Sequence, residues 1–146
     1  MSRYKDKLNH LCCIRVFSKI MYDDLKKIGM DENKSFTVRL PKLDDSLMRH
    51  LLRGYFDGDG SLCLTDTTFG VSFTTASKLF SDDVIAYLKR NGYHPSIYSY
   101  VSDFDTKMYT ISLYRKSEKI RFLDYIYKDS NVYLDRKYNR YLKVKE

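Results

Sequence analysis

The segment 44–60 constrains the fold more than any other part of the chain. Its apolar residues recur at helical spacing, at Leu47, Leu51, Leu52, Tyr55 and Phe56, and the run stops at Asp57-Gly-Asp-Gly60. Within this predicted helix Gly54 and Gly58 lie four residues apart, so they share one face. An interior glycine costs a helix about 1 kcal/mol relative to alanine. Two of them on one face indicate that a second helix packs closely there.

The rest of the chain alternates between strand and helix patterns. Period-2 alternation predicts two strands joined by a turn at Asp66-Thr-Thr68, one around 61–65 and one over 69–74, and further strands over 96–101 and 107–114. Apolar spacing and capping residues predict helices over 18–28, 77–91, 117–128 and 131–145. Near the N-terminus, apolar and β-branched residues predict strands over 11–17 and 36–40. This mixture predicts a single α+β unit.

The composition of the chain limits the classes of partner that it can be expected to bind and the compartment in which we expect it. A chain of 146 residues with 43% apolar residues can bury one core, and no apolar run reaches the roughly 18 residues of a membrane span. The net charge of +7 favours a polyanionic partner. Cys12, Cys13 and Cys63 form no C-x-x-C pair, and no secretory segment is visible, so we expect packing roles for the cysteines and a cytoplasmic or similar reducing compartment.

Two segments of the chain repeat each other. Ser18–Asp24 matches Ser77–Asp83, and Leu25–Gly29 matches Leu88–Gly92 after a four-residue insertion. Duplication explains both matches, but the first copy has no room for a counterpart of 44–74. We therefore expect an incomplete first repeat over 1–43 and a complete unit over 44–146.

Leu52-Arg-Gly-Tyr-Phe-Asp-Gly-Asp-Gly60 resembles the signature of the LAGLIDADG homing endonucleases. Six of its nine positions agree, and the flanking segments 33–35, 40–41 and 133–138 also look like parts of the intron- and intein-associated members. The resemblance implies an αββαββα unit. It further implies that two motif helices pack at a twofold or pseudo-twofold axis, and that a saddle of antiparallel strands lies on DNA.

The two aspartates of the motif carry the expected chemistry. Asp57 and Asp59 are about 200° apart around a helix, so only one of them can serve a given site. Phosphodiester hydrolysis needs a hard cation, and Mg²⁺ prefers carboxylate oxygen. The resemblance gives the metal to Asp59 with the Gly58 carbonyl and makes Lys116 the active-site lysine. It places Gly54, Asp57 and Gly58 at the helix interface, where Asp57 caps the partner helix.

A calcium-binding loop is the competing interpretation of these carboxylates. Position six counted from Asp57 is Leu62, where such a loop needs glycine, and position twelve is Thr68, where it needs glutamate. We exclude a calcium loop on these grounds.

The same alternation predicts a DNA face. If the apolar strand residues Leu62, Leu64, Phe69, Val71, Phe73, Tyr109, Ile111 and Leu113 point at the core, the opposite face carries Ser61, Cys63, Thr65, Ser72, Thr74, Tyr98, Tyr100, Thr110, Ser112 and Tyr114. A two-stranded ribbon of this kind fits a major groove. Basic residues that we expect to contact phosphate are Arg115 and Lys116 after the last strand, and Arg136, Lys137, Arg140 and Lys143 on the C-terminal helix.

These features together predict a site-specific endonuclease that cuts duplex DNA with a divalent metal, Mg²⁺. One motif gives one catalytic aspartate per chain, so two chains must meet through their 44–59 helices to cut both strands. Two alternatives stay open from the residues alone. One is a catalytically inactive DNA-binding protein of the same fold, and the other is an RNA-binding intron splicing helper, a maturase.

Overall fold

The computed structural model describes residues 15–30 and 34–145. The elements follow in the order α1 (Lys19–Lys27), η1 (Lys34–Phe36), α2 (Asp45–Asp59), β1 (Gly60–Leu64), β2 (Phe69–Thr75), α3 (Lys78–Arg90), β3 (Pro95–Val101), β4 (Lys107–Leu113), α4 (Lys116–Tyr127) and α5 (Asp135–Lys145). From α2 to α4 the order is αββαββα, so the expected α+β unit is confirmed. Among the described helices, none is long and apolar enough to cross a bilayer.

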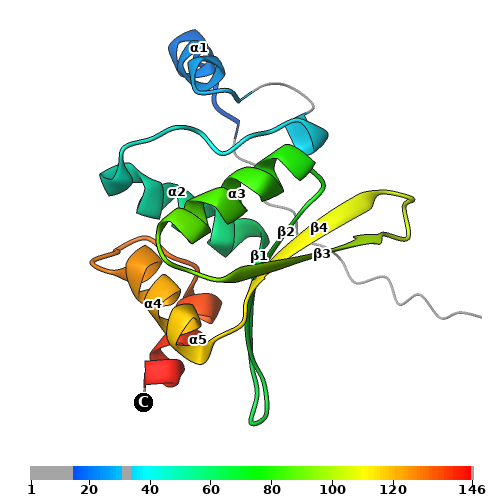
Figure 1. The fold of residues 1–146 in the computed structure, drawn as a ribbon. Coiled ribbons are helices and arrows are strands. Elements are labelled where there is room, and N and C mark those ends of the chain that lie inside the picture. The colour runs from blue at the N-terminus through cyan, green and yellow to red at the C-terminus, as the bar shows by residue number, and fades with distance from the viewer. Residues whose placement is uncertain (1–14, 31–33, 146) are drawn as a thin grey trace, which may run out of the picture.

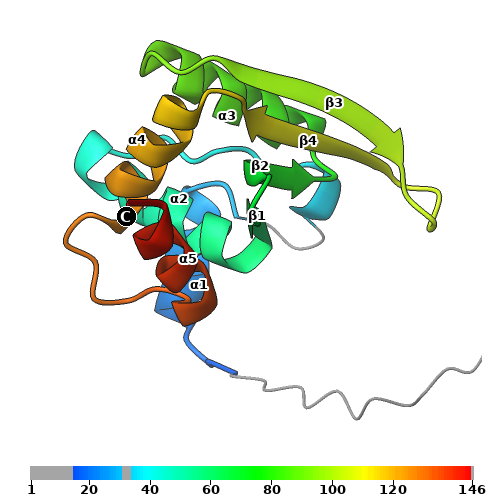
Figure 2. The same cartoon turned by 90° about the horizontal axis from the view of Figure 1, so that it is seen from below.

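The four strands form one antiparallel sheet in the order β1-β2-β4-β3. Leu62, Val71 and Leu113 lie opposite one another across three strands. Because paired residues share a face, this register puts the apolar positions together. Figure 1 shows α2, α3 and α4 on one side of the sheet, and both views show the β3–β4 hairpin extending past the helices (Figures 1 and 2).

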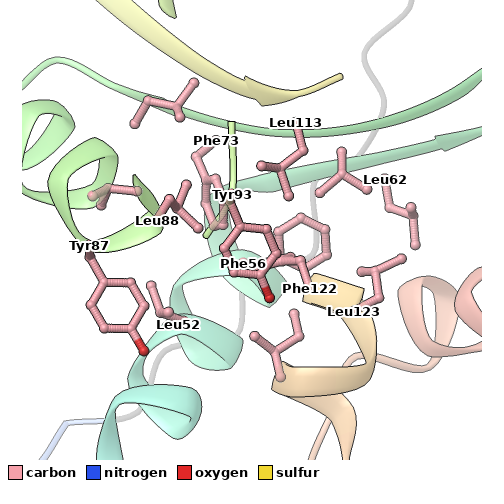
Figure 3. Packing of buried hydrophobic residues seen from close by; sticks show 14 of the residues in the cluster. Leu52, Phe56, Leu62, Phe73, Tyr87, Leu88, Tyr93, Leu113, Phe122 and Leu123 are labelled. Atoms are coloured by element: carbon pink, nitrogen blue, oxygen red, sulfur yellow. The ribbon is translucent and has the colours of Figure 1, made fainter. Parts of the chain in front are cut away.

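The core lies between that face of the sheet and the helices. Phe56 of α2, Phe73 of β2 and Phe122 of α4 meet edge to face, with ring centroids 5.5–5.9 Å apart (Figure 3). All three rings are almost completely buried. Of the strand residues expected in the core, Leu62, Val71, Phe73, Ile111 and Leu113 are buried, and Leu64, Phe69 and Tyr109 are half-buried. The alternation in the sequence is therefore confirmed as the inside–outside pattern of the sheet.

The expected strand at 36–40 is wrong. Its first residue belongs to the short helix η1, and the following residues have no regular secondary structure. Their backbone groups bond to α3 instead of a strand: the Ser77 hydroxyl donates to the Val38 carbonyl at 2.7 Å, and the Leu40 N–H donates to Asp83 at 3.2 Å. Val38 and Leu40 of this segment pack on the core without joining the sheet, whereas Phe36 is exposed.

The strand expected at 11–17 is only partly testable. Residues 15–17 have no regular secondary structure, so that end of the prediction is wrong, and 11–14 lie outside the described residues.

The two copies of the sequence repeat form helices with the same ends. The Ser18 and Ser77 hydroxyls each accept the N–H three residues on, both at 3.2 Å. Gly29 and Gly92 follow the two helices with φ of +89° and +72°, a conformation that favours glycine. However, α3 buries part of its apolar face whereas α1 buries no residue. The repeated sequence thus encodes the same local helix in two different tertiary settings.

Candidate functional site

Helix α2 has one buried face and one uncovered face. Met48, Leu52 and Phe56, each four residues apart, are buried against the core. On the other face Leu47 is 51% exposed. A methyl group built at Gly54 or Gly58 would meet no atom within 4 Å outside the helix backbone and the adjacent residues of the described chain. The close helix partner that the two glycines predict is therefore absent from the described part of this chain.

An open hollow of about 830 Å³ lies beside this face of α2. Its walls come from α2, from the segment before it and from β2, and include Leu40, Leu51, Gly54, Asp59 and Thr74. Most of the wall is apolar. An apolar hollow along an uncovered glycine face is suited to a second helix, and its wall includes Asp59 of the motif.

Asp59 is the last residue of α2 and is exposed. Within the described residues no hydrogen bond or ion pair engages its carboxylate, although the helix C-terminus nearby disfavours negative charge. The carboxylate is open to a ligand from outside the chain.

Asp57 is fully engaged within its own chain. The Tyr127 hydroxyl donates to one carboxylate oxygen at 2.6 Å, and the Leu134 N–H donates to the other at 3.0 Å. Burial and this bond to the carboxylate raise the pKa of Tyr127 above its ordinary value. In this structure the Asp57 carboxylate links α2 to the end of α4 and to the residue before α5, and the expected cap on a partner helix stays a prediction.

Among the residues that we expected at the DNA surface, Lys137 differs most from the prediction. It is only 1% exposed, so the expectation of a phosphate contact is wrong. Its ammonium donates to the carbonyls of Phe56, Asp57 and Gly60, at the end of α2. Burial lowers its pKa below the ordinary value, with the neighbouring Arg136 acting in the same direction.

The sequence did contain a signal for the burial of Lys137. The residue lies three positions after Leu134 and four before Tyr141, on the same stripe of α5 as these apolar residues. Arg140 is exposed, but its guanidinium donates to the Leu62 carbonyl at 2.7 Å, so it too supports the junction of α2 and β1.

The donors at the motif fit half of a magnesium site. The Asp59 carboxylate and the Gly58 carbonyl are the hard oxygen ligands that Mg²⁺ accepts, and Mg²⁺ is commonly held by one or two carboxylates plus substrate phosphate and water. The described residues contain no cluster of three or more His, Cys, Asp or Glu side chains able to hold a metal ion. The described residues of one chain therefore supply at most one carboxylate and one carbonyl at the motif as candidate ligands.

Lys116 is not brought next to Asp59. Gly60, which follows Asp59, lies level with Ile111 across the sheet, whereas Lys116 comes five residues after Ile111, at the start of α4. The strands β1 and β4 are also two spacings apart, roughly 10 Å. Within one chain Lys116 and Asp59 do not form a common site.

The outer face of the sheet gathers most of the predicted DNA-facing residues. Ser61, Ser72 and Ser112 lie opposite one another, as do Thr74, Thr110 and Tyr98. The exposed members of the predicted set are Ser61, Cys63, Thr65, Tyr98, Tyr100, Tyr114, Arg115, Arg136 and Arg140; Ser72, Thr74 and Ser112 are half-buried. This face carries polar side chains and aromatic rings.

Several members of the predicted set have partners inside the chain, among them Thr110 with Thr74 and Arg115 with Glu118. Thr110 is buried and its hydroxyl bonds to that of Thr74 at 3.0 Å, so an accessible base contact at Thr110 is wrong for this structure. Arg115 is exposed, but its guanidinium also reaches the buried Glu118 at 3.3 Å.

Comparison with protein families matches residues 46–127 to the LAGLIDADG-like domain. No curated protein matches the chain. The matched segment spans more than half of the chain, from the first turn of α2 to the end of α4, and contains Gly54, Gly58 and Asp59. Both the motif and the αββαββα unit built around it lie within the match, and the chain belongs to the LAGLIDADG-like domain family.

Proposed function

We propose that this protein is a site-specific endonuclease of the homing type, intron- or intein-associated, which hydrolyses phosphodiester bonds of duplex DNA with a divalent metal. The observation that carries the proposal is the exposed Asp59 carboxylate, which has no partner among the described residues, at the end of the uncovered face of α2. Membership of the LAGLIDADG-like family supports it.

The proposed active assembly is a homodimer. The second copy places its α2 in the hollow beside Gly54 and Gly58, which brings the two Asp59 residues to one end of the helix pair. Each copy then contributes one carboxylate, and two strands can be cut. The apolar wall of the hollow and the absent side chains at the glycines support this arrangement.

The proposed chemistry divides into holding a metal and holding DNA. When bound, Mg²⁺ polarises the phosphate and lowers the pKa of a bound water. Asp59 and the Gly58 carbonyl hold the ion. The outer face of the sheet, with Tyr98 and Tyr100 stacked at 6.2 Å between ring centroids, lies against the groove, and exposed arginines such as Arg136 contact phosphate.

The test uses supercoiled DNA that carries the genomic neighbourhood of the gene, incubated with the protein with and without Mg²⁺. We expect linear product only with Mg²⁺, and none from Asp59→Asn, while DNA affinity stays within severalfold. Asp23→Asn, an exposed aspartate on α1, is the matched control and should cut normally. Cleavage by the Asp59 variant would show that this carboxylate is misassigned.

The same experiment separates the two alternatives. Binding of duplex DNA without cleavage in any divalent metal favours an inactive DNA-binding protein. Preference for folded intron RNA over duplex DNA favours a splicing helper. Either result would overturn the proposed nuclease.

A further inference from the structure

Lys137 is a buried charged side chain whose position needs an explanation. A lysine that loses its hydration shell is costly unless its ammonium is fully hydrogen-bonded. Here the three donors of the ammonium meet three carbonyls, those of Phe56, Asp57 and Gly60, the last two at 3.0 and 2.5 Å. An ammonium has three donors, so this side chain is saturated by main-chain oxygens alone.

The three residues whose carbonyls bind Lys137 flank the proposed metal ligands in the sequence. Phe56 and Asp57 precede Gly58 and Asp59, and Gly60 follows them. Among the described residues no side chain bonds to the Gly58 carbonyl. The ammonium therefore fixes the backbone on both sides of the two ligand residues and leaves their own oxygens open.

The charge of Lys137 also matters at this position. The C-terminus of a helix carries the negative end of its dipole, which disfavours the Asp59 carboxylate in the same turn. A buried ammonium at that end offsets this repulsion without occupying the carboxylate. An exposed lysine would do so less well, because water screens its charge.

We propose that Lys137 is a positioning residue of the metal site, which holds the turn from α2 to β1 so that Asp59 and the Gly58 carbonyl face the bound cation. The proposal rests on the proposed function and extends it to α5, which lies beyond the matched family segment. Lys137 touches neither metal nor substrate; it acts through the backbone of the turn.

The test measures Mn²⁺ binding to the full chain by the loss of the free-ion electron paramagnetic resonance signal. Lys137→Met keeps the length of the side chain and removes its charge and donors. We expect its Mn²⁺ affinity to fall roughly tenfold or more, as it does when other residues that orient metal ligands without touching the metal are replaced. Lys89→Met, at an exposed lysine on α3, should bind as the unaltered protein does.

A second control separates positioning from general stability. Leu123→Ala removes a fully buried side chain of α4 and destabilises the core without touching the turn. We expect its Mn²⁺ affinity to stay unchanged at temperatures where it is folded. An equal loss of affinity in Leu123→Ala and Lys137→Met would overturn the proposal, as would native affinity in Lys137→Met.

Asp59→Asn distinguishes failure of this inference from failure of the proposed function. If the unaltered protein binds Mn²⁺ and only Asp59→Asn loses it, the metal site stands and Lys137 has no part in it. If the unaltered protein does not bind Mn²⁺, the metal site itself is refuted, and the role of Lys137 with it.

The unaltered protein provides a readout if Lys137→Met does not fold. With ¹⁵N-labelled lysine, the saturated ammonium should give a signal protected from exchange, and that signal should shift when Mg²⁺ is added. Exposed lysines such as Lys143 should show neither property. A protected signal that does not respond to Mg²⁺ contradicts the proposal.

Discussion

At the scale of single residues, two aspartates only two positions apart have different environments. Asp57 is half-buried and accepts two hydrogen bonds, one from Tyr127 at the end of α4 and one from Leu134 just before α5, whereas Asp59 is exposed and has no partner in the described chain. The first stabilises the fold, and the second is left for a ligand. Their substitution should therefore affect different properties.

Asp57→Asn should destabilise the protein. An amide can accept one of the two bonds, but its NH₂ group then faces the Leu134 N–H or the Tyr127 hydroxyl. Hydrogen bonds to charged groups contribute about 1.5–3 kcal/mol, so we expect a loss of that order in the free energy of unfolding. Urea denaturation measures it, with Asp59→Asn as the control that should change stability little. Equal effects of the two variants would contradict this assignment.

Glu118 should make the protein sensitive to acid. Burial alone would raise its pKa, but hydrogen bonds from His94 and the charges of His94 and Arg115 outweigh burial and hold the pKa below the ordinary 4.5. The stabilisation is complete above the unfolded value and is lost as the pH falls through the lowered folded pKa.

The measurement for Glu118 is thermal unfolding as a function of pH. Glu118→Gln should be less stable at neutral pH and should lose less stability than the unaltered protein below pH 4.5. Parallel curves for the two proteins in that range would show that the carboxylate does not drive the acid sensitivity.

At the scale of elements, helix α2 has one face that packs in the core and an opposite face on which two glycines leave room for another helix. Phe56 packs against β2 and α4, while Gly54 and Gly58 stay open. The glycines cost the isolated helix stability, and only close packing with a second helix offsets that cost.

Gly54→Ala should have opposite effects on the monomer and on the dimer. At concentrations where the chain is monomeric, the free methyl group should raise the free energy of unfolding by about 1 kcal/mol. In the dimer the same methyl group enters the helix contact, and overpacking of about 1–3 kcal/mol should weaken association. Chemical denaturation at low concentration and analytical ultracentrifugation at micromolar concentration measure the two effects.

Gly54→Leu extends this test. It should stay folded, because a Cβ at this position meets no atom of the described residues within 4 Å and Gly54 borders the open hollow beside α2, and it should be monomeric and unable to cut both strands. A native protein that is monomeric at micromolar concentration and remains so on DNA would refute the dimer.

At the scale of the whole molecule, α2, α3 and α4 pack on one face of the sheet, the opposite face carries polar and aromatic side chains, and the net charge is +7 (Figure 1). Several exposed cations lie at the ends of the sheet or on α5, including Arg115, Lys116 and Arg136. Lys137 does not belong to this set, because its charge is buried under the motif helix.

DNA affinity should fall steeply with salt, by a log–log slope of about −0.9 for each phosphate contact. Replacing Arg115, Lys116 and Arg136 by Ala should flatten that slope by up to about three units on the same rule. The matched control replaces Lys27, Lys89 and Arg90 on α1 and α3, which removes the same charge from exposed positions on the helices. Equal changes in the two triple variants would place the DNA surface elsewhere.

The sequence by itself determined the elements from α2 to α4 and the inside–outside pattern of the sheet. Helical spacing, the serine caps, the positive-φ glycine after α3 and strand alternation act over a few residues, so they are visible in the chain. The glycine pair of α2 was visible for the same reason, whereas the choice of Asp59 over Asp57 as the candidate metal ligand came from the resemblance to the LAGLIDADG signature. The segment 36–40 shows the limit: its strand-like alternation reflects packing on the core, while its backbone bonds to Ser77 and Asp83 of α3 and its cap.

Only the tertiary structure decided what the charged residues around the motif do. Asp57 is bound by residues 70 and 77 positions later, and Lys137 reaches back 77–81 positions to the end of α2. No local pattern specifies such partners, because the chain in between must fold before the groups meet. A lysine on a partly apolar stripe can be solvated or buried with equal local preference, and the carbonyls exposed at the end of α2 supply the bonds that make burial of Lys137 favourable.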